Sequence, residues 1–235
     1  MRLSSRAATL LAVAAALPLA LTACSTGSTD ASAPSAKQTK AKDPNAGLLT
    51  GTQLKKLLAP ASAFPAGYTV EDDNTADSGA ELLSTSARKT TKPDCVSLES
   101  TSWIQVTGYK NSSSFAQNDY VNAQKTEEVA QEIDEFPAAQ AKDAMKQIEA
   151  VATRCATFTD TDAHAKVKVT GKATAGLGEE AYTMTLTSGK WQNGTTLVAA
   201  RSGSSVGTVL STAGSDNGAA SAKKLTATIL AGLKK

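Results

Sequence analysis

Residues 182–210 read YTMTLTSGKWQNGTTLVAARSGSSVGTVL, and this stretch decides the fold. Runs rich in β-branched and apolar residues lie at 182–186, 195–201 and 205–210, with clusters of Gly, Ser and Asn between them. Such runs predict strands, and the short polar breaks predict hairpins. We therefore expect an antiparallel meander in this part of the chain.

Helices are expected on both sides of the meander. Before it, apolar residues recur at helical spacing over 141–155, just after Pro137, and predict an amphipathic helix. Residues 165–170 alternate between apolar and polar, as a half-buried strand does. After the meander, a stripe over 222–233 predicts a second helix. Antiparallel strands with helices between and after them make an α+β domain.

The domain is expected to begin near Leu48. Thr50 and Gln53 have the spacing of a capping box, and they precede a short apolar helix that Pro60 ends. Residues 68–70 read as the start of a strand.

Three further segments have less regular patterns of apolar and polar residues. Residues 72–92 are polar and read as a loop, whereas 103–109 alternate as a half-buried strand. Residues 115–136 fit either a strand or a helix, because their few apolar side chains match both periods.

The first residues have the pattern of a bacterial lipoprotein signal peptide. Arg2 and Arg6 form a positive n-region, and the apolar run 7–21 has 15 residues, fewer than the roughly 20 that a membrane-spanning helix needs. The run ends in Leu21-Thr22-Ala23-Cys24, which resembles the lipobox, where the chain is cut before a cysteine that carries a diacylglycerol. We expect residues 1–23 to be removed and Cys24 to be lipidated. An ordinary secretory signal cut before Cys24 is the alternative.

Residues 24–47 read as a tether. No large apolar side chain follows Cys24 in this segment, so it cannot bury enough surface to offset the entropy of ordering. We expect a flexible coil with a root-mean-square span of about 25 Å. Residues 48–235 would then form a single domain on the outer face of the cell membrane.

Composition excludes several classes of protein. The chain has 24 basic and 22 acidic residues among 235, and the signal peptide carries two of the basic ones and no acid. The mature chain is therefore neutral, without the basic stripe of a nucleic-acid binder. With a single histidine in the chain, we expect neither a metal site nor a cofactor.

Cys95 and Cys155 are the thiols that remain once Cys24 is acylated. Thiols outside the cytosol are oxidised, so we expect a disulfide between them, with two free thiols as the alternative. The bond would close a loop of about 60 residues, for which the chain-entropy estimate is roughly 4 kcal/mol. Without Cys-x-x-Cys spacing, a catalytic redox pair is not expected.

Four short motifs carry a resemblance to a known family. They are Pro93-Asp94-Cys95, Phe136-Pro137 before the helix that ends at Cys155, Leu177-Gly178-Glu179-Glu180, and Leu197-Val198-Ala199-Ala200-Arg201-Ser202-Gly203. Over residues 48–235 the chain resembles actinobacterial lipoproteins related to the PknH-like extracellular sensor domain of membrane kinases. The resemblance implies a curved antiparallel sheet packed against helices, with a cleft for a ligand. Kinase members of that family have two disulfides and a tryptophan before the helix cysteine, whereas this chain allows one pair and has Arg154 there.

Catalytic patterns are few. Gly203-Ser204-Ser205-Val206-Gly207 matches the nucleophile elbow of hydrolases, but the one histidine, His164, precedes the match. We interpret the match as the small residues of a hairpin. For His164 with Asp160 and Asp162 we expect a solvated loop rather than a metal site. Glu179-Glu180 reads as ordinary surface charge, because neighbours on a strand point to opposite faces.

Trp103 and Trp191 are the largest apolar side chains. They could line a ligand cleft, although filling a core that is short of large side chains is the favoured interpretation.

Together these features predict no enzyme. They predict a membrane-anchored extracytoplasmic lipoprotein with a ligand-binding or sensing domain, whose partner is an envelope ligand or a membrane protein. A carrier of lipid or glycolipid is the alternative, and it would need a dry apolar cavity on the order of hundreds of Å³.

Overall fold

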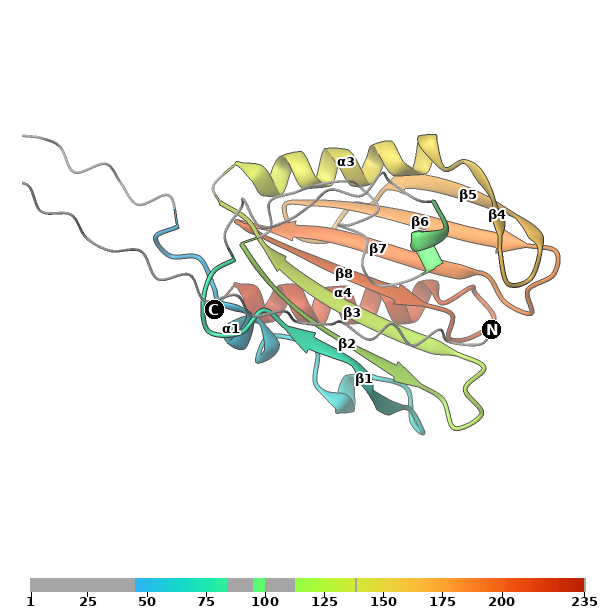
Figure 1. Cartoon of the computed structure of the whole chain (residues 1–235), viewed down its shortest axis with the longest axis horizontal. Coiled ribbons are helices and arrows are strands. Elements are labelled where there is room, and N and C mark those ends of the chain that lie inside the picture. Colours follow the sequence, from blue (N-terminus) through green and yellow to red (C-terminus); the bar gives the residue numbers. More distant parts are fainter. Residues whose placement is uncertain (1–44, 84–94, 100–112, 138, 235) are drawn as a thin grey trace, which may run out of the picture.

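The computed structural model describes residues 45–83, 95–99, 113–137 and 139–234. Eight strands form one antiparallel sheet in the order β1-β2-β3-β8-β7-β6-β5-β4, with helices packed on it (Figure 1). The strands are β1 (Thr69–Asp77), β2 (Ser114–Val121), β3 (Glu128–Glu135), β4 (Thr157–Asp160), β5 (Ala165–Ala173), β6 (Glu180–Ser188), β7 (Thr195–Ser202) and β8 (Ser205–Ser211). The helices are α1 (Gly51–Lys55), η1 (Ala61–Ala63), η3 (Cys95–Glu99), α3 (Gln140–Arg154) and α4 (Ala219–Leu233). The expected α+β class is confirmed.

The N-terminal expectations lie outside this part of the chain. The signal peptide, Cys24, most of the tether and Trp103 all belong to residues that the structure does not describe. None of the helices in the described ranges has the length and apolar content of a membrane span.

The meander that the sequence predicts is formed by β6, β7 and β8. Its last hairpin pairs Ser202 with Ser205 and so has a two-residue turn. The first turn residue, Gly203, has a φ of 61°, a conformation that glycine adopts without a steric penalty. The small residues of the G-x-S-x-G match therefore serve the hairpin.

Alternate residues of the central strands enter two separate cores. On β7, Leu197 and Ala199 pack with α3, whereas Val198 and Ala200 pack with α4 on the opposite face. Strands buried on both faces lose the alternation between apolar and polar residues, as the run from 195 to 201 does. We call the two surfaces of the sheet the α3 face and the α4 face.

Helix α3 confirms the expected amphipathic helix. Its buried stripe is Ala141, Ala144, Met145, Ile148, Val151 and Ala152. A disulfide joins Cys155, directly after α3, to Cys95 of η3, with 5.5 Å between their Cα atoms. The predicted pairing is thus present, and it fastens η3 to the end of α3.

The segment around α1 is fastened to the sheet by polar contacts. The Thr50–Gln53 capping box is present, as the sequence predicts. After the helix, the Ala59 N–H donates to Gln131 Oε1 at 2.8 Å, and Gln131 Nε2 donates to the Ala59 carbonyl at 3.0 Å. Gln131 is fully buried, and these two bonds, with a third from Nε2 to Asn118 Oδ1 at 2.8 Å, satisfy its amide inside the α4-side core.

Three segments differ from or complete the sequence prediction. The ambiguous stretch 115–136 forms β2 and β3, a hairpin in full register. The loop expected over 72–92 is wrong for its first part, because β1 continues to Asp77. As an edge strand, β1 is solvated on both sides and lacks the alternation that marks a buried strand. The solvated loop expected around Asp160, Asp162 and His164 begins only after Asp160, because that residue ends the short strand β4.

Candidate functional site

The α4 face of β4, β5 and β6 is exposed over much of its area. Lys166, Lys168 and Lys172 project from alternate positions of β5, and all are exposed. Register with β4 and β6 places threonines on either side of this row. We call the following set the lysine face: Thr157, Thr159, Lys166, Lys168, Thr170, Lys172, Thr183, Thr185 and Thr187.

No helix covers the lysine face in the described part of the chain. Helix α4 contacts β7 and β8, and the contacts of α3 with β5 and β6 are on the opposite side of the sheet. Next to the uncovered surface, an open depression of ≈ 710 Å³ is lined by Ala156, Thr157, Lys166, Lys168, Val169, Thr187, Ser188 and Gly189. Two threonine hydroxyls and two lysine ammonium groups supply polar contacts in this lining, beside the apolar side chains of Ala156 and Val169.

The charges on the lysine face are not compensated locally. The α4-face positions of β4, β5 and β6 include no Asp or Glu. Within the described ranges, none of Lys166, Lys168 and Lys172 forms an ion pair. The lysine face therefore presents a positive charge of about three units to solvent.

A cluster of carboxylates lies on the α3 face near the opposite edge of the sheet, on β1, β2 and β3. Register pairs Glu71 with Asp119, and Glu128 lies diagonally across from Asp119. Burial, with Glu128 and Glu71 nearby, raises the pKa of Asp119 to about 8. Burial and Glu71 raise the pKa of Glu128 to about 7. We call Glu71, Asp119 and Glu128 the acidic cluster.

The acidic cluster does not have the arrangement of a metal centre. No group of at least three His, Cys, Asp or Glu side chains in the described ranges is placed to hold a metal ion. Lys125 Nζ instead contacts Glu71 Oε1 at 2.6 Å. The Asp119 side chain is 5% exposed and its Oδ1 has no hydrogen-bond partner, which agrees with a carboxyl that holds a proton near neutral pH.

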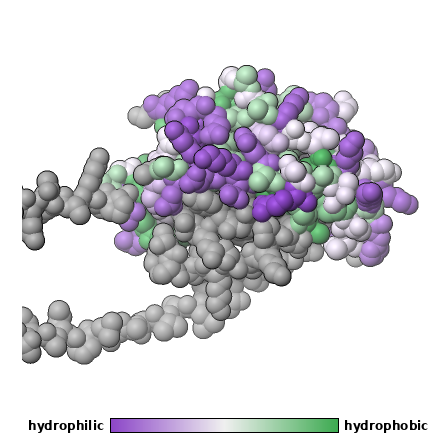
Figure 2. Space-filling view, turned by 90° about the horizontal axis from the view of Figure 1, so that it is seen from above, coloured by the Kyte–Doolittle hydropathy of each residue, from purple (hydrophilic) through white to green (hydrophobic). Residues whose placement is uncertain are grey.

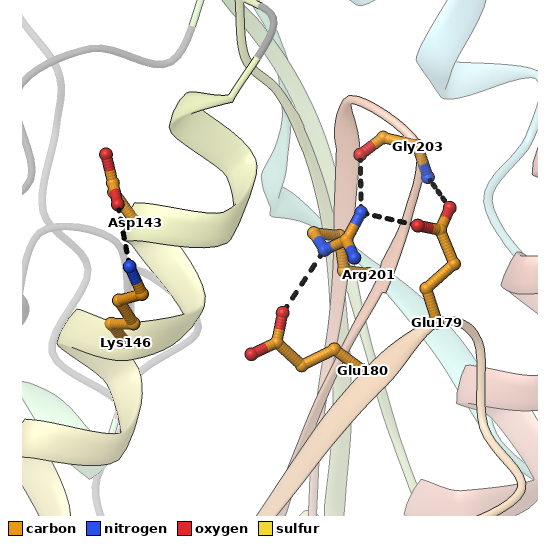
Figure 3. A network of polar contacts seen from close by, with 6 residues as sticks. All are labelled: Asp143, Lys146, Glu179, Glu180, Arg201 and Gly203. Atoms are coloured by element: carbon orange, nitrogen blue, oxygen red, sulfur yellow. Dashed lines mark hydrogen bonds and ion pairs between the residues drawn. The ribbon is translucent and has the colours of Figure 1, made fainter.

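Glu179 and Glu180 bind one guanidinium, which the sequence interpretation did not anticipate (Figure 3). Arg201 Nη1 donates to Glu179 Oε2 at 2.8 Å, and Arg201 Nε donates to Glu180 Oε2 at 3.2 Å. The expectation that the two side chains point to opposite faces was wrong, because β6 begins at Glu180 and Glu179 lies before the strand. Glu179 is nevertheless exposed, as a surface charge is. The Gly203 N–H and then Arg201 lower the pKa of Glu179. This network fastens the β7–β8 turn to the start of β6.

The serines of the G-x-S-x-G match are engaged with Glu135. Ser204 and Ser205 each donate a hydroxyl to one oxygen of the Glu135 carboxylate at 2.5 Å. Ser205 is 4% exposed, so a substrate carbonyl has no access to its hydroxyl. His164 immediately precedes β5. The antiparallel pairing of β5, β6, β7 and β8 places the start of β5 level with the end of β8, so His164 lies at the opposite end of the strands from Ser205 at the start of β8. A hydrolase built on Ser205 and His164 is excluded by this geometry.

Asp160 and Trp191 form a structural pair. Trp191 Nε1 donates to Asp160 Oδ2 at 2.7 Å, and the Trp191 ring packs against the α3-side core. Asp160 Oδ1 accepts the backbone N–H groups of Asp162 and Ala163. Trp191 does not line the depression, and Asp160 is committed to shaping its turn rather than to a ligand.

The described surface offers little apolar area for a ligand or a partner. Val70 on β1 is the one exposed large apolar side chain among the described residues. Figure 2 shows hydrophilic side chains interspersed with smaller apolar ones across the described part of one surface. Polar contacts must therefore supply most of any recognition there.

Part of the candidate site was visible in the sequence. The alternation Lys166-Val167-Lys168-Val169 already places both lysines on one face of a strand. Nothing in the sequence indicated that this face lacks a covering helix. The acidic cluster was missed because Glu71 and Asp119 are far apart in the chain, and only strand pairing brings them together.

The chain matches no model of a known protein family, and no curated protein is detectably similar to it.

Proposed function

We propose that this chain is an extracytoplasmic lipoprotein, anchored to the outer face of the cell membrane by a diacylglycerol on Cys24. Its domain, residues 48–235, acts as a non-catalytic ligand-binding or sensing module. The lipobox and the tether support the anchoring. The resemblance to PknH-like sensor domains belongs to the same proposal, and an antiparallel sheet packed against helices is compatible with it.

The observation that carries the binding function is the uncovered lysine face. A sheet surface without a helix on it leaves polar side chains free for a ligand, and here they line an open depression. The disulfide at Cys95 and Cys155 supports a location outside the cytosol, where such bonds persist.

The environments of the serines support a non-catalytic role. Ser205 is buried and bonded to Glu135, and the only histidine lies at the far end of the sheet. A lipid or glycolipid carrier is less well supported, because the depression is open to solvent and has lysine and threonine beside its apolar side chains, whereas a carrier needs an enclosed apolar cavity.

Metabolic labelling tests the anchoring. Labelled palmitate should enter the wild-type chain produced in a bacterium with lipoprotein processing, and Cys24→Ala should abolish the label. A label of equal strength in both would contradict lipidation at Cys24. Mass spectrometry of the purified protein tests the carrier, which requires a co-purified lipid in stoichiometric amount.

Binding itself is tested by thermal unfolding of the whole protein with soluble fragments of the bacterial cell wall. A rise in the unfolding midpoint that saturates with fragment concentration is expected. Turnover of the fragments on incubation would contradict the non-catalytic assignment.

A further inference from the structure

The lysines of β5 form a linear array with uneven spacing. Side chains two residues apart on a strand lie about 6.8 Å apart on the same face. Lys166 and Lys168 are neighbours at this spacing, and Lys172 lies about 14 Å beyond Lys168 along the strand. The array is therefore about 20 Å long, which is too long for its members to converge on a single small anion.

Hydroxyl groups run beside this array. Thr157 and Thr159 belong to β4 on one side, and Thr183, Thr185 and Thr187 belong to β6 on the other. Each hydroxyl can donate and accept a hydrogen bond. A row of cations between two rows of hydroxyls complements a chain that repeats anionic and hydroxyl groups.

The shape of the surface favours a chain over a membrane. The depression beside Lys166 and Lys168 is hollow, and a flat bilayer cannot enter it. A membrane-binding surface would also expose apolar side chains beside its cations, but Val70, the exposed large apolar residue of the described chain, is on β1 at the opposite edge of the sheet.

We propose that the lysine face binds a linear polyanion of the cell envelope, a chain of polyol or sugar units joined by phosphodiesters, lying along β5. The three lysines contact phosphates along the polymer as point charges, and the flanking threonines contact its hydroxyl groups. This inference rests on the proposed binding function and gives the chemical class of its ligand.

The test measures binding of a defined glycerol phosphate oligomer to the whole lipidated chain in a zwitterionic detergent, over a range of salt concentrations. The test variant is the triple K166Q/K168Q/K172Q. The matched control is K56Q/K142Q/K146Q, which removes three exposed lysines from α3 and the end of α1. Unfolding midpoints of both variants show that the fold is retained.

The wild-type protein should bind the oligomer at low salt and should bind inorganic phosphate far more weakly. The triple variant should lose about 100-fold in affinity, at about fivefold for each charged contact. The slope of log affinity against log salt should fall by about 2 in magnitude. The control should keep the wild-type affinity and slope.

Several results would overturn the inference. These are no binding of the oligomer to the wild-type chain at low salt, an equal loss in the triple and control variants, or tighter binding to phosphatidylglycerol vesicles than to the oligomer. Palmitate labelling and stabilisation by other cell-wall fragments are separate measurements. If the oligomer fails while those succeed, the choice of ligand is wrong and the proposed function stands.

Discussion

The two edges of the sheet carry opposite charges, one set buried and the other exposed to solvent. At one edge Asp119 is buried between Glu71 and Glu128, and burial raises its pKa to about 8. At the other edge, Lys166, Lys168 and Lys172 are exposed and unpaired within the described ranges. Near neutral pH the acidic edge is therefore partly protonated, whereas the lysine edge keeps its charge.

The fold separates charges that cancel in the amino-acid composition. Residues 24–235 contain 22 basic and 22 acidic side chains and so have no formal net charge. The fold separates the charges and suppresses some of the negative ones by burial. The resulting field is positive around the lysine face, and it depends on strand pairing rather than on composition.

The largest effect on stability is expected from the disulfide, which joins η3 to the chain directly before β4. Cys155 lies between α3 and β4, and η3 contacts β4. Reducing the bond, or changing both cysteines to alanine, should cost about 4 kcal/mol of unfolding free energy. Denaturant unfolding with and without reductant measures this, and equal stability would show that the bond contributes nothing.

The covered and uncovered halves of the α4 face should respond differently to truncation. Ile229 of α4 is fully buried against the sheet, so Ile229→Ala should destabilise by about 3 kcal/mol. Thr185→Ala, on the lysine face, should cost less than about 1 kcal/mol. Similar losses at both positions would indicate that the lysine face is covered in solution.

The acidic cluster should give a stability that depends on pH. The folded state keeps a proton on Asp119 up to about pH 8, whereas the unfolded chain releases it near pH 4. The folded state therefore binds more protons in this window, and stability should fall as pH rises from about 4 to 8.

Asp119→Asn should remove most of this fall and should stabilise the protein by several kcal/mol at pH 8. Unfolding curves across the pH range measure the effect. Glu127→Gln is the control of opposite sign, because the Gly214 N–H and then Tyr68 lower the pKa of Glu127. The Glu127→Gln variant should be less stable than the wild type at neutral pH. This difference should vanish as the pH falls through the lowered pKa of Glu127 in the folded state. A flat profile for the wild type would contradict the buried, protonated Asp119.

The smallest effect on stability is expected from the lysine face. K166Q/K168Q/K172Q should change the free energy of unfolding by no more than about 0.5 kcal/mol, because exposed side chains without partners contribute little to folding. A loss of several kcal/mol in thermal unfolding would mean that these lysines serve the fold rather than a ligand.

The sequence predicted the parts of the fold that have a strong period. The stripes of α3 and α4 and the meander were readable because each element buries a defined face. The edge strand β1 was not, because it has no buried face. Residues 115–136 stayed ambiguous because β3 places Gln131 in a core position, where a hydrogen bond to Ala59 replaces apolar packing.

The candidate site divides in the same way. The lysine row follows from local alternation on β5 and was within reach of the sequence. The convergence of Glu179 and Glu180 on Arg201, and of two serines on Glu135, requires contacts between separate strands. Such contacts have no local signature in a single sequence.

Mapping the bound polymer on the protein tests the central claim most directly. Backbone NMR shifts of the protein produced with its full sequence and purified in zwitterionic detergent, recorded with and without the glycerol phosphate oligomer, would locate the bound oligomer. The account predicts shifts concentrated on β4, β5 and β6, largest near Lys166, Lys168 and Lys172, with none at Glu71 and Asp119. Shifts scattered over the surface, or centred on β1 to β3, would contradict it.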